Sequence, residues 1–165
     1  MGLKQFHVEL TEEMKITTLV SLLSDVTYNQ AIVFTRKVER AKHLHRMLEK
    51  LNLPTLTVHR DMTQERRIES YRQFKEGKKR VMVSTNLLAR GIDIDKVNLV
   101  INFDAPEGSD DYLHRVGRAG RFNTKGIAVT FITSEEDRKV LAEIQERFEV
   151  KIEELPKTFE EKTLL

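Results

Sequence analysis

The sequence predicts an α/β domain in which a mostly parallel central sheet is covered by helices on both faces, in a three-layer α/β/α arrangement. Short apolar runs rich in β-branched residues alternate along the chain with longer stretches of helical periodicity. Some of these runs, such as Ala31-Ile32-Val33-Phe34, are continuous, which is typical of strands buried on both faces. Such alternation favours right-handed crossovers between parallel strands.

The first half of the chain alternates in this way from its start. Strands are predicted at residues 6–10, 31–35 and 55–59. Thr11 is expected to cap a helix with apolar positions at Met14, Leu19, Leu22 and Leu23. Further helices are predicted at 38–51 and 64–75, the latter ending near Gly77.

The second half continues the pattern, with strands predicted at 80–85, 99–103 and 127–133. Ser109 is expected to cap a helix that runs towards Arg118. Ser134 opens the last long helix, with Asp137 three residues later as its capping-box partner. Residues 151–155 are predicted as an edge strand. The domain therefore covers residues 1–156, followed by a polar tail at 157–165.

Composition limits the class of protein. A chain of 165 residues suits one domain, and 39% hydrophobic with 33% charged residues indicates a soluble globular protein. No apolar run approaches the roughly 20 residues of a membrane-spanning helix. The absence of cysteine excludes disulfides and cysteine–zinc sites. A net charge of +2 says little about nucleic acid, so the positions of the arginines matter more.

Polar side chains follow four successive predicted strands. In open parallel sheets, ligands bind beyond the carboxyl ends of the strands, and these ends share one edge. The groups expected there are Thr35, Arg36 and Lys37; His59, Arg60, Asp61, Gln64 and Arg67; Thr85, Asn86, Arg90, Gly91 and Asp93; and Asp104. One such loop is ordinary surface, but four at the same edge indicate a polyanion or several anions as the ligand.

The segment 114–121 is the most specific signal. Its arginines recur at every third residue and therefore lie near one face of a helix: Arg115, Arg118 and Arg121. Gly117 and Gly120 allow a backbone or ligand to approach closely. A guanidinium is a rigid fork that matches two phosphate oxygens. The alternative is a solvated basic helix end that interacts with the helix dipole, which would not require the interleaved glycines.

The segment 84–93 also suits a phosphate or a sugar. Thr85, at the end of a strand, can donate hydrogen bonds to a phosphate, and Gly91 permits a turn that projects Asp93. The Asp93 carboxylate can accept hydrogen bonds from ribose hydroxyls. The alternative, in which Asp93 caps its own backbone, is equally compatible with this segment taken alone.

Metal binding is not predicted. His43 and His45 lie two residues apart on a helix and so face different directions. Asp93 and Asp95 are similar to an Asp-x-Asp metal motif, but the ribose role is preferred for Asp93.

Taken in order and spacing, these motifs resemble those of the second RecA-like domain of DEAD-box ATP-dependent RNA helicases. The matching segments are 31–35 (motif IV), 64–67 (Gln-x-x-Arg), 84–93 (motif V) and 114–121 (motif VI). A narrower resemblance, to the DECD-box helicases of nuclear mRNA splicing and export, rests on Ser84-Thr85-Asn86, His59-Arg60 and the segment 147–156. Asn86 departs from the Asp of the general pattern and Asn123 from the Gly of the subfamily, so no role is carried over to either.

The resemblance implies a P-loop NTPase-like helicase C-terminal domain with divided ligands. Arg118 and Arg121 would act as arginine fingers on ATP, beside Asp93 and Gly91. RNA would be held through its sugar–phosphate backbone by Thr85, Gln64, Arg67, Arg90 and Arg36. His114 and Arg115 would form the contact between lobes.

ATP and Mg²⁺ would be held mainly by an N-terminal RecA-like lobe. The sequence contains neither the Gly-x-x-x-x-Gly-Lys-Ser/Thr loop nor the Asp-Glu-x-Asp tetrad, so this chain alone is expected not to hydrolyse ATP. The resemblance further implies RNA, that lobe, and mRNA splicing and export proteins as partners, with a nuclear location and no membrane association.

Three other interpretations remain open from the residues alone. A non-catalytic RecA-like adaptor that binds RNA or protein would not need the arginine fingers. A small self-contained phosphatase would need a nucleophile, and no serine or aspartate stands in an activated setting. A DNA helicase of the same superfamily shares the arginine motif and differs in its choice of nucleic acid.

Overall fold

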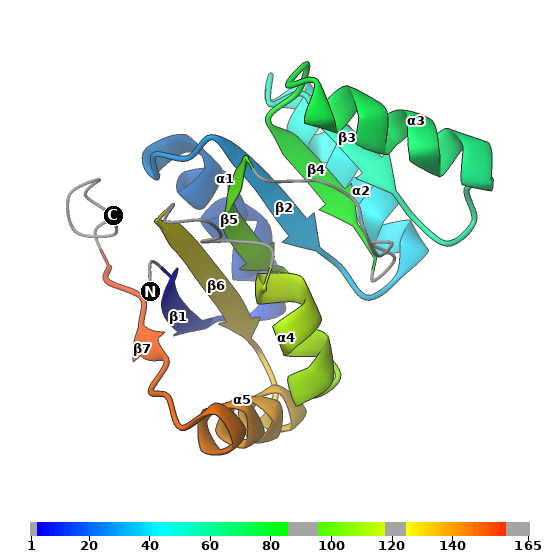
Figure 1. The fold of residues 1–165 in the computed structure, drawn as a ribbon. Helices are drawn as coiled ribbons and strands as arrows, with labels where there is room; N and C mark the ends of the chain where they lie inside the picture. Colours follow the sequence, from blue (N-terminus) through cyan, green and yellow to red (C-terminus); the bar gives the residue numbers. More distant parts are fainter. Residues whose placement is uncertain (1–2, 86–95, 118–124, 158–165) are drawn as a thin grey trace.

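The strands form one parallel sheet. A computed structural model of the chain describes residues 3–85, 96–117 and 125–157. Within this part of the chain the sheet is 7-stranded, in the order β3-β4-β2-β5-β6-β1-β7, and every pairing is parallel (Figure 1). The strands are β1 (Leu3–Glu9), β2 (Gln30–Phe34), β3 (Thr55–Val58), β4 (Val81–Ser84), β5 (Val97–Asn102), β6 (Gly126–Ile132) and β7 (Glu153–Glu154).

Helices cover both faces of the sheet, as predicted. They are the 3₁₀ helix η1 (Glu12–Met14) and the α-helices α1 (Lys15–Asp25), α2 (Val38–Lys50), α3 (Gln64–Lys75), α4 (Ser109–Val116) and α5 (Glu135–Phe148). Helices α1 and α2 pack in one apolar cluster, and α3, α4 and α5 in the other. None of the helices in the described ranges has the length and apolar character needed to cross a bilayer.

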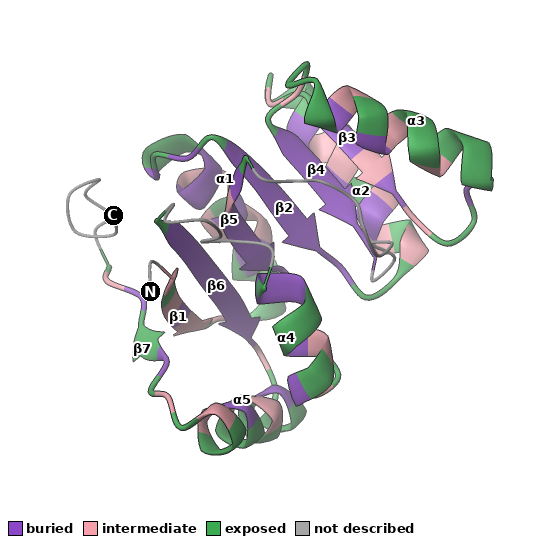
Figure 2. Ribbon diagram, viewed as in Figure 1, coloured by how far each residue is buried: buried purple, intermediate pink, exposed green. Residues whose placement is uncertain are grey.

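Strand β2 shows why the continuous apolar run predicted a doubly covered sheet. All five of its residues are buried (Figure 2). Ala31 and Val33 belong to the cluster beneath α1 and α2, whereas Ile32 and Phe34 belong to the opposite one. Since successive side chains in a strand point to opposite faces, each of these residues contributes to one core. Full burial of such a side chain is worth about 1.5–3 kcal/mol.

Two predicted helix starts differ from the structure. Thr11 is the N-cap of η1, but its hydroxyl makes no capping hydrogen bond. Met14, predicted as one of the apolar positions of the helix, is 50% exposed. Met14 lies in η1, one residue before the buried stripe of α1, which is formed by Lys15, Leu19, Leu22 and Leu23. The spacing of that stripe is i, i+4, i+7 and i+8, so its first position belongs to a lysine.

The start of α4 also differs. The N-cap is Gly108, in an extended conformation, and Ser109 is the first helical residue. The Ser109 hydroxyl instead donates to Glu143 and accepts from Arg147, both on α5. At α5 the capping prediction is confirmed, because Ser134 accepts a hydrogen bond from the Asp137 N–H at 3.1 Å.

Neighbouring strands β2 and β5 form a topological switch point. They pair in parallel, yet the helices that follow them, α2 and α4, cover opposite faces of the sheet. A crevice therefore opens beyond their carboxyl ends, which is where open α/β sheets bind ligands. Arg36 lies just beyond the end of β2, and Asp104 just beyond the end of β5.

Candidate functional site

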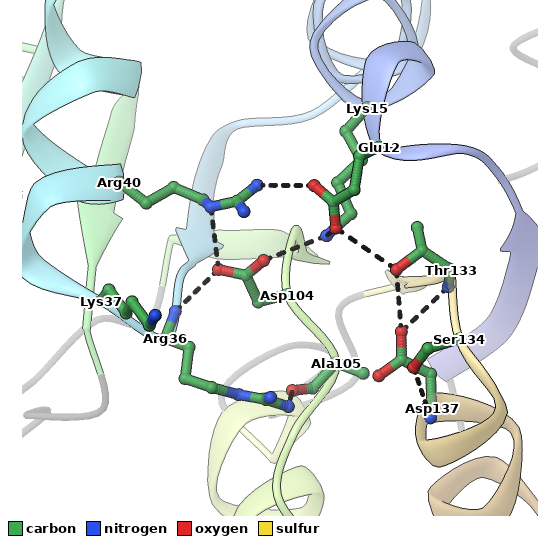
Figure 3. Close-up of a pocket in the computed structure, with 10 residues that line it drawn as sticks. All are labelled: Glu12, Lys15, Arg36, Lys37, Arg40, Asp104, Ala105, Thr133, Ser134 and Asp137. Carbon is green, nitrogen blue, oxygen red and sulfur yellow. Dashed lines mark hydrogen bonds and ion pairs between the residues drawn. The ribbon is translucent and has the colours of Figure 1, made fainter.

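A polar pocket of about 260 Å³ occupies this edge of the sheet (Figure 3). It lies beyond the carboxyl ends of β2, β5 and β6 and is closed on one side by η1 and the start of α1. Its lining combines cations and carboxylates: Lys15, Arg36, Lys37 and Arg40 with Glu12, Asp104 and Asp137, joined by Ala105, Thr133 and Ser134.

The carboxylate of Asp104 lies at the centre of the pocket. Its Oδ1 accepts a hydrogen bond from Lys15 Nζ at 3.0 Å. Its Oδ2 accepts one from the backbone N–H of Arg36 at 2.9 Å and lies 3.6 Å from Arg40 Nε. Asp104 is only 8% exposed, so these groups replace water around both of its oxygens. Its side chain therefore joins β5, α1 and the loop after β2.

Lys15 is a buried cation with two carboxylate partners. It is 2% exposed and lies 3.0 Å from Glu12 Oε1 as well as from Asp104. A buried unpaired charge costs several kcal/mol, and paired charges reduce that cost. Partial burial pushes the pKa of Glu12 upward, but the hydrogen bonds and charges of Lys15 and Arg40 prevail and lower it. Glu12 is therefore ionised at neutral pH.

Two arginines grip the backbone that leaves β5. Arg36 Nη2 donates to the carbonyl of Ala105 at 2.7 Å. Arg115 Nη1, from α4, donates to the carbonyl of Asp104 at 2.8 Å. Arg60 Nη2, from the loop after β3, donates to the carbonyl of Arg36 at 3.2 Å. The loops after three strands and helix α4 are thus connected by direct hydrogen bonds.

Arg115 is buried within this domain at 1% exposure. Its guanidinium also donates to Asn102 Oδ1 at 3.2 Å, pairs with Asp111 at 3.3 Å and lies 5.2 Å from the centroid of the Phe34 ring. Burial lowers the pKa of Arg115, and the charges of Asp111 and Asp104 oppose that effect. The neighbouring His114 is exposed. A contact of these two residues with another lobe remains a prediction.

The residues expected to hold RNA fall at the same edge. Thr85 is fully buried, and its hydroxyl has no hydrogen-bond partner among the described residues. Arg36 and Gln64 are exposed, and Arg67 is half-buried. The Nε of Arg67 likewise has no partner within the described ranges. A buried polar atom left unsatisfied costs about 1–3 kcal/mol, so such atoms indicate a bound ligand or water.

Other predicted site residues lie outside the described ranges: Arg90, Gly91, Asp93, Arg118 and Arg121. Arg118 follows directly on Gly117, the C-cap of α4. A Cβ at Gly117 would lie 2.8 Å from the carbonyl oxygen of Leu113, closer than real contacts allow. Gly117 is therefore required by the packing of the last turn of α4, in addition to the close ligand approach that its place in the motif suggested.

The histidines of α2 make ordinary contacts. His45 Nδ1 lies 2.6 Å from Thr55 Oγ1, and His43 is exposed. Burial lowers the pKa of His45 and outweighs the charge of Glu49. Over the part of the chain that the structure covers, no group of three or more His, Cys, Asp or Glu side chains is placed to hold a metal ion.

Sequence reasoning assigned no role to Asp104, Lys15, Arg40 or Glu12. Asp104 was placed correctly at the ligand edge, but its partners come from distant parts of the chain. One signal was available for Lys15. It occupies the first position of the apolar stripe that continues with Leu19 and Leu22, and a lysine in such a stripe indicates a buried ion pair.

The comparisons with known proteins agree with this geometry. Residues 14–123 match the helicase conserved C-terminal domain. The chain is 49% identical over 164 residues to DEAD-box ATP-dependent RNA helicase 56 of Oryza sativa subsp. japonica, and 52% identical over 155 residues to ATP-dependent RNA helicase SUB2 of Kluyveromyces lactis. These alignments cover 99% and 94% of this chain but only 38% and 36% of the relatives.

Solved structures show the same fold. Saccharomyces cerevisiae Dbp5 bound to RNA and ADP BeF3 has a TM-score of 0.85 and 31% identity, covering 94% of this chain and 42% of that one. Escherichia coli DEAD-box protein SrmB, bound to regulator of ribonuclease activity A, has a TM-score of 0.84 and 33% identity, covering 96% of each chain. The chain belongs to the helicase conserved C-terminal domain family and is the C-terminal RecA-like domain of a DEAD-box RNA helicase.

Proposed function

We propose that this chain supplies one of the two lobes that a full-length helicase closes around ATP and RNA. That protein would hydrolyse ATP when RNA is bound and would use closure to open short duplexes or remodel RNA–protein particles. The observation that carries the proposal is the gathering of arginines, Thr85 and Asp104 at one sheet edge beside the switch point. The narrower resemblance to the DECD-box helicases supports a role in nuclear mRNA splicing and export.

RNA would lie along the loops after β2, β3 and β4. Arg36 and Gln64 are exposed there, and the Thr85 hydroxyl and the Arg67 Nε, which have no hydrogen-bond partner among the described residues, suit a polar ligand. Arg90 would complete the set. A surface of guanidinium, amide and hydroxyl groups suits phosphate and sugar oxygens, which carry no direct sequence information. Binding would therefore be independent of sequence and sensitive to salt.

The nucleotide would be shared with the other lobe. Arg118 and Arg121 would stabilise the charge that develops on the transferred phosphoryl group, and Asp93, next to Gly91, would accept from the ribose. ATP and Mg²⁺ would be held mainly by the N-terminal lobe, because the sequence of this chain contains neither a phosphate-binding loop nor a DEAD-type tetrad. Exposed His114 would reach towards that lobe, while buried Arg115 holds α4 in place.

The test is RNA-stimulated ATP hydrolysis by the full-length protein. Arg118→Ala is expected to lower the rate by about 10³-fold or more, the size of arginine-finger effects in related NTPases. Arg46→Ala, an exposed arginine on α2 away from this edge, is the control and is expected to keep the parent rate. Rapid hydrolysis by Arg118→Ala, or by this chain alone, would contradict the proposal. RNA binding without any hydrolysis by the parent protein would favour a non-catalytic adaptor.

A further inference from the structure

We infer that Asp104 is a positioning residue that couples RNA bound at the loop after β2 to the helix that leads to Arg118. The inference rests on the proposed function and adds a route between the two ligands. RNA would engage Arg36, and the nucleotide would meet Arg118. Asp104 is bonded both to the residue on the RNA side and to the helix on the nucleotide side.

On the proposed RNA side, Arg36 donates hydrogen bonds to Asp104 and Ala105. The Arg36 N–H donates to Asp104 Oδ2 at 2.9 Å, and the Arg36 guanidinium donates to the Ala105 carbonyl at 2.7 Å. The backbone N–H and the guanidinium of Arg36 are therefore both bound to the segment after β5, one to Asp104 and the other to Ala105. A displacement of Arg36 by a bound phosphate would have to move this segment or break those bonds.

On the proposed nucleotide side, Arg115 of α4 contacts the backbone of Asp104. Arg115 Nη1 donates to the Asp104 carbonyl at 2.8 Å, and its guanidinium is fixed further by Asn102 and Asp111. Arg115 is 1% exposed, so it cannot move without repacking the core. It lies one residue before the end of α4, and Arg118 follows Gly117 in the chain. A shift at Asp104 would therefore be passed to the last residues of α4, from which the chain continues to Arg118.

Both carboxylate oxygens of Asp104 are occupied by protein groups, so Asp104 would position its neighbours and would not bind a ligand itself. Lys15 and the Arg36 N–H occupy its two carboxylate oxygens, Arg40 lies close to one of them, and little of the residue is exposed (Figure 3). The carboxylate is thus committed to holding three elements together. Energetic coupling between two sites can be carried by a contiguous network of hydrogen bonds and ion pairs of this kind. This network joins the end of β2 to α4 across the switch point.

The test measures coupling in the full-length protein. A fluorescently labelled oligouridylate is titrated with and without ADP and beryllium fluoride, and the ratio of the two affinities is the coupling factor. Lys15→Met serves as the background, because it removes the buried cation that would otherwise be left with one carboxylate partner when Asp104 is changed. It leaves the Arg36 and Arg115 contacts intact.

In this background, Asp104→Ala is expected to lower the coupling factor by about tenfold, within the usual range of allosteric coupling. RNA affinity without nucleotide is expected to change much less. Asp104→Asn keeps an oxygen that accepts from the Arg36 N–H and is expected to restore most of the coupling. Glu12→Gln is the matched control, since Glu12 contacts Lys15 and Arg40 but makes no described contact with Arg36 or Arg115.

Coupling in the Asp104→Ala protein equal to that of its background would overturn the inference, as would an equal loss in the Asp104→Asn protein. If the alanine protein does not fold, Asp104→Ser replaces it, because a serine oxygen is polar but lies one bond short of the Arg36 N–H. If the RNA affinity of the Lys15→Met protein were the same with and without nucleotide, the proposed function itself would be contradicted. The two failures are therefore distinguishable.

Discussion

At the scale of single residues, the pocket depends on a buried charge that needs its partners. Lys15 is almost fully buried and pairs with both Glu12 and Asp104, but Glu12 is exposed and Asp104 is not. Asp104 is therefore the stronger partner, since a pair in a less polar environment is less screened by water. Removing either member of the Lys15–Asp104 pair is therefore expected to destabilise the fold, because the other charge stays buried without its main partner.

Asp104→Ala in this chain is expected to lower the free energy of unfolding by about 3 kcal/mol, because it leaves Lys15 buried with one exposed partner. Adding Lys15→Met is expected to recover more than half of that loss, since no buried cation then remains. Urea unfolding followed by circular dichroism measures both values. A single variant as stable as the parent, or a double variant no better than the single one, would show that this ion pair does not govern stability.

His45 gives a stability that depends on pH. Burial lowers its pKa below the ordinary value of about 6.5, so the unfolded chain binds the proton more tightly than the folded one. The contribution of His45 to the free energy of unfolding is therefore fully present above the pKa that His45 has in the unfolded chain. It is lost as the pH falls towards the pKa of His45 in the folded chain. The urea midpoint is expected to be lower at about pH 5.5 than at about pH 7.5.

His45→Gln is expected to reduce that difference in the urea midpoint. The difference should not vanish, because burial also lowers the pKa of His59. His43→Gln is the control, as His43 is exposed on the same helix. A pH dependence unchanged by His45→Gln would contradict the assignment.

At the scale of elements, α4 is the short helix on which the proposed mechanism depends. Its buried face, Tyr112, Arg115 and Val116, packs against the sheet, and its last turn ends at Gly117. Gly117→Ala would place a Cβ 2.8 Å from the Leu113 carbonyl, and overpacking of this kind costs about 1–3 kcal/mol. Thermal unfolding of this chain measures the loss.

Gly108→Ala is the matched control at the other end of α4. A Cβ there would meet no atom within 4 Å, and the backbone is extended. Its expected cost is only that of a poorer N-cap, about 0.5 kcal/mol. Equal losses for the two variants would argue against a steric role for Gly117.

The elements also show which features follow from local sequence. Strand β2 and helix α3 were predicted because a continuous apolar run and a helical segment that ends near a glycine are local signals. The start of α4 was not, since Gly108 and Ser109 both suit a helix start and contacts with α5 decide between them. For the site, the parallel-sheet rule predicted the edge. The partners of Asp104 were not predictable, because Lys15 lies 89 residues away and only the sheet order brings the two together.

At the scale of the whole molecule, the sheet brings together groups that are far apart in the chain. The parallel strands direct their carboxyl ends to one edge, and the switch at β2 and β5 opens that edge to a ligand. A net charge of +2 would not indicate a nucleic-acid protein, so the proposed affinity for RNA would depend on the local arrangement of cations. This edge is half of the proposed RNA clamp, and the chain alone is therefore expected to bind RNA weakly.

Salt provides the test at this scale. In the full-length protein, the logarithm of RNA affinity is expected to fall linearly with the logarithm of salt concentration, with a slope of about −0.7 for each phosphate contact on single-stranded RNA. Arg36→Ala should weaken binding to all sequences alike and make the slope shallower by about one contact. Arg46→Ala, the exposed arginine of α2, should leave the slope unchanged. This chain alone should give a shallower slope than the full-length protein. A salt slope that Arg36→Ala leaves unchanged would mean that Arg36 does not contact the phosphate backbone. The same conclusion would follow if Arg36→Ala abolished a preference for particular RNA sequences.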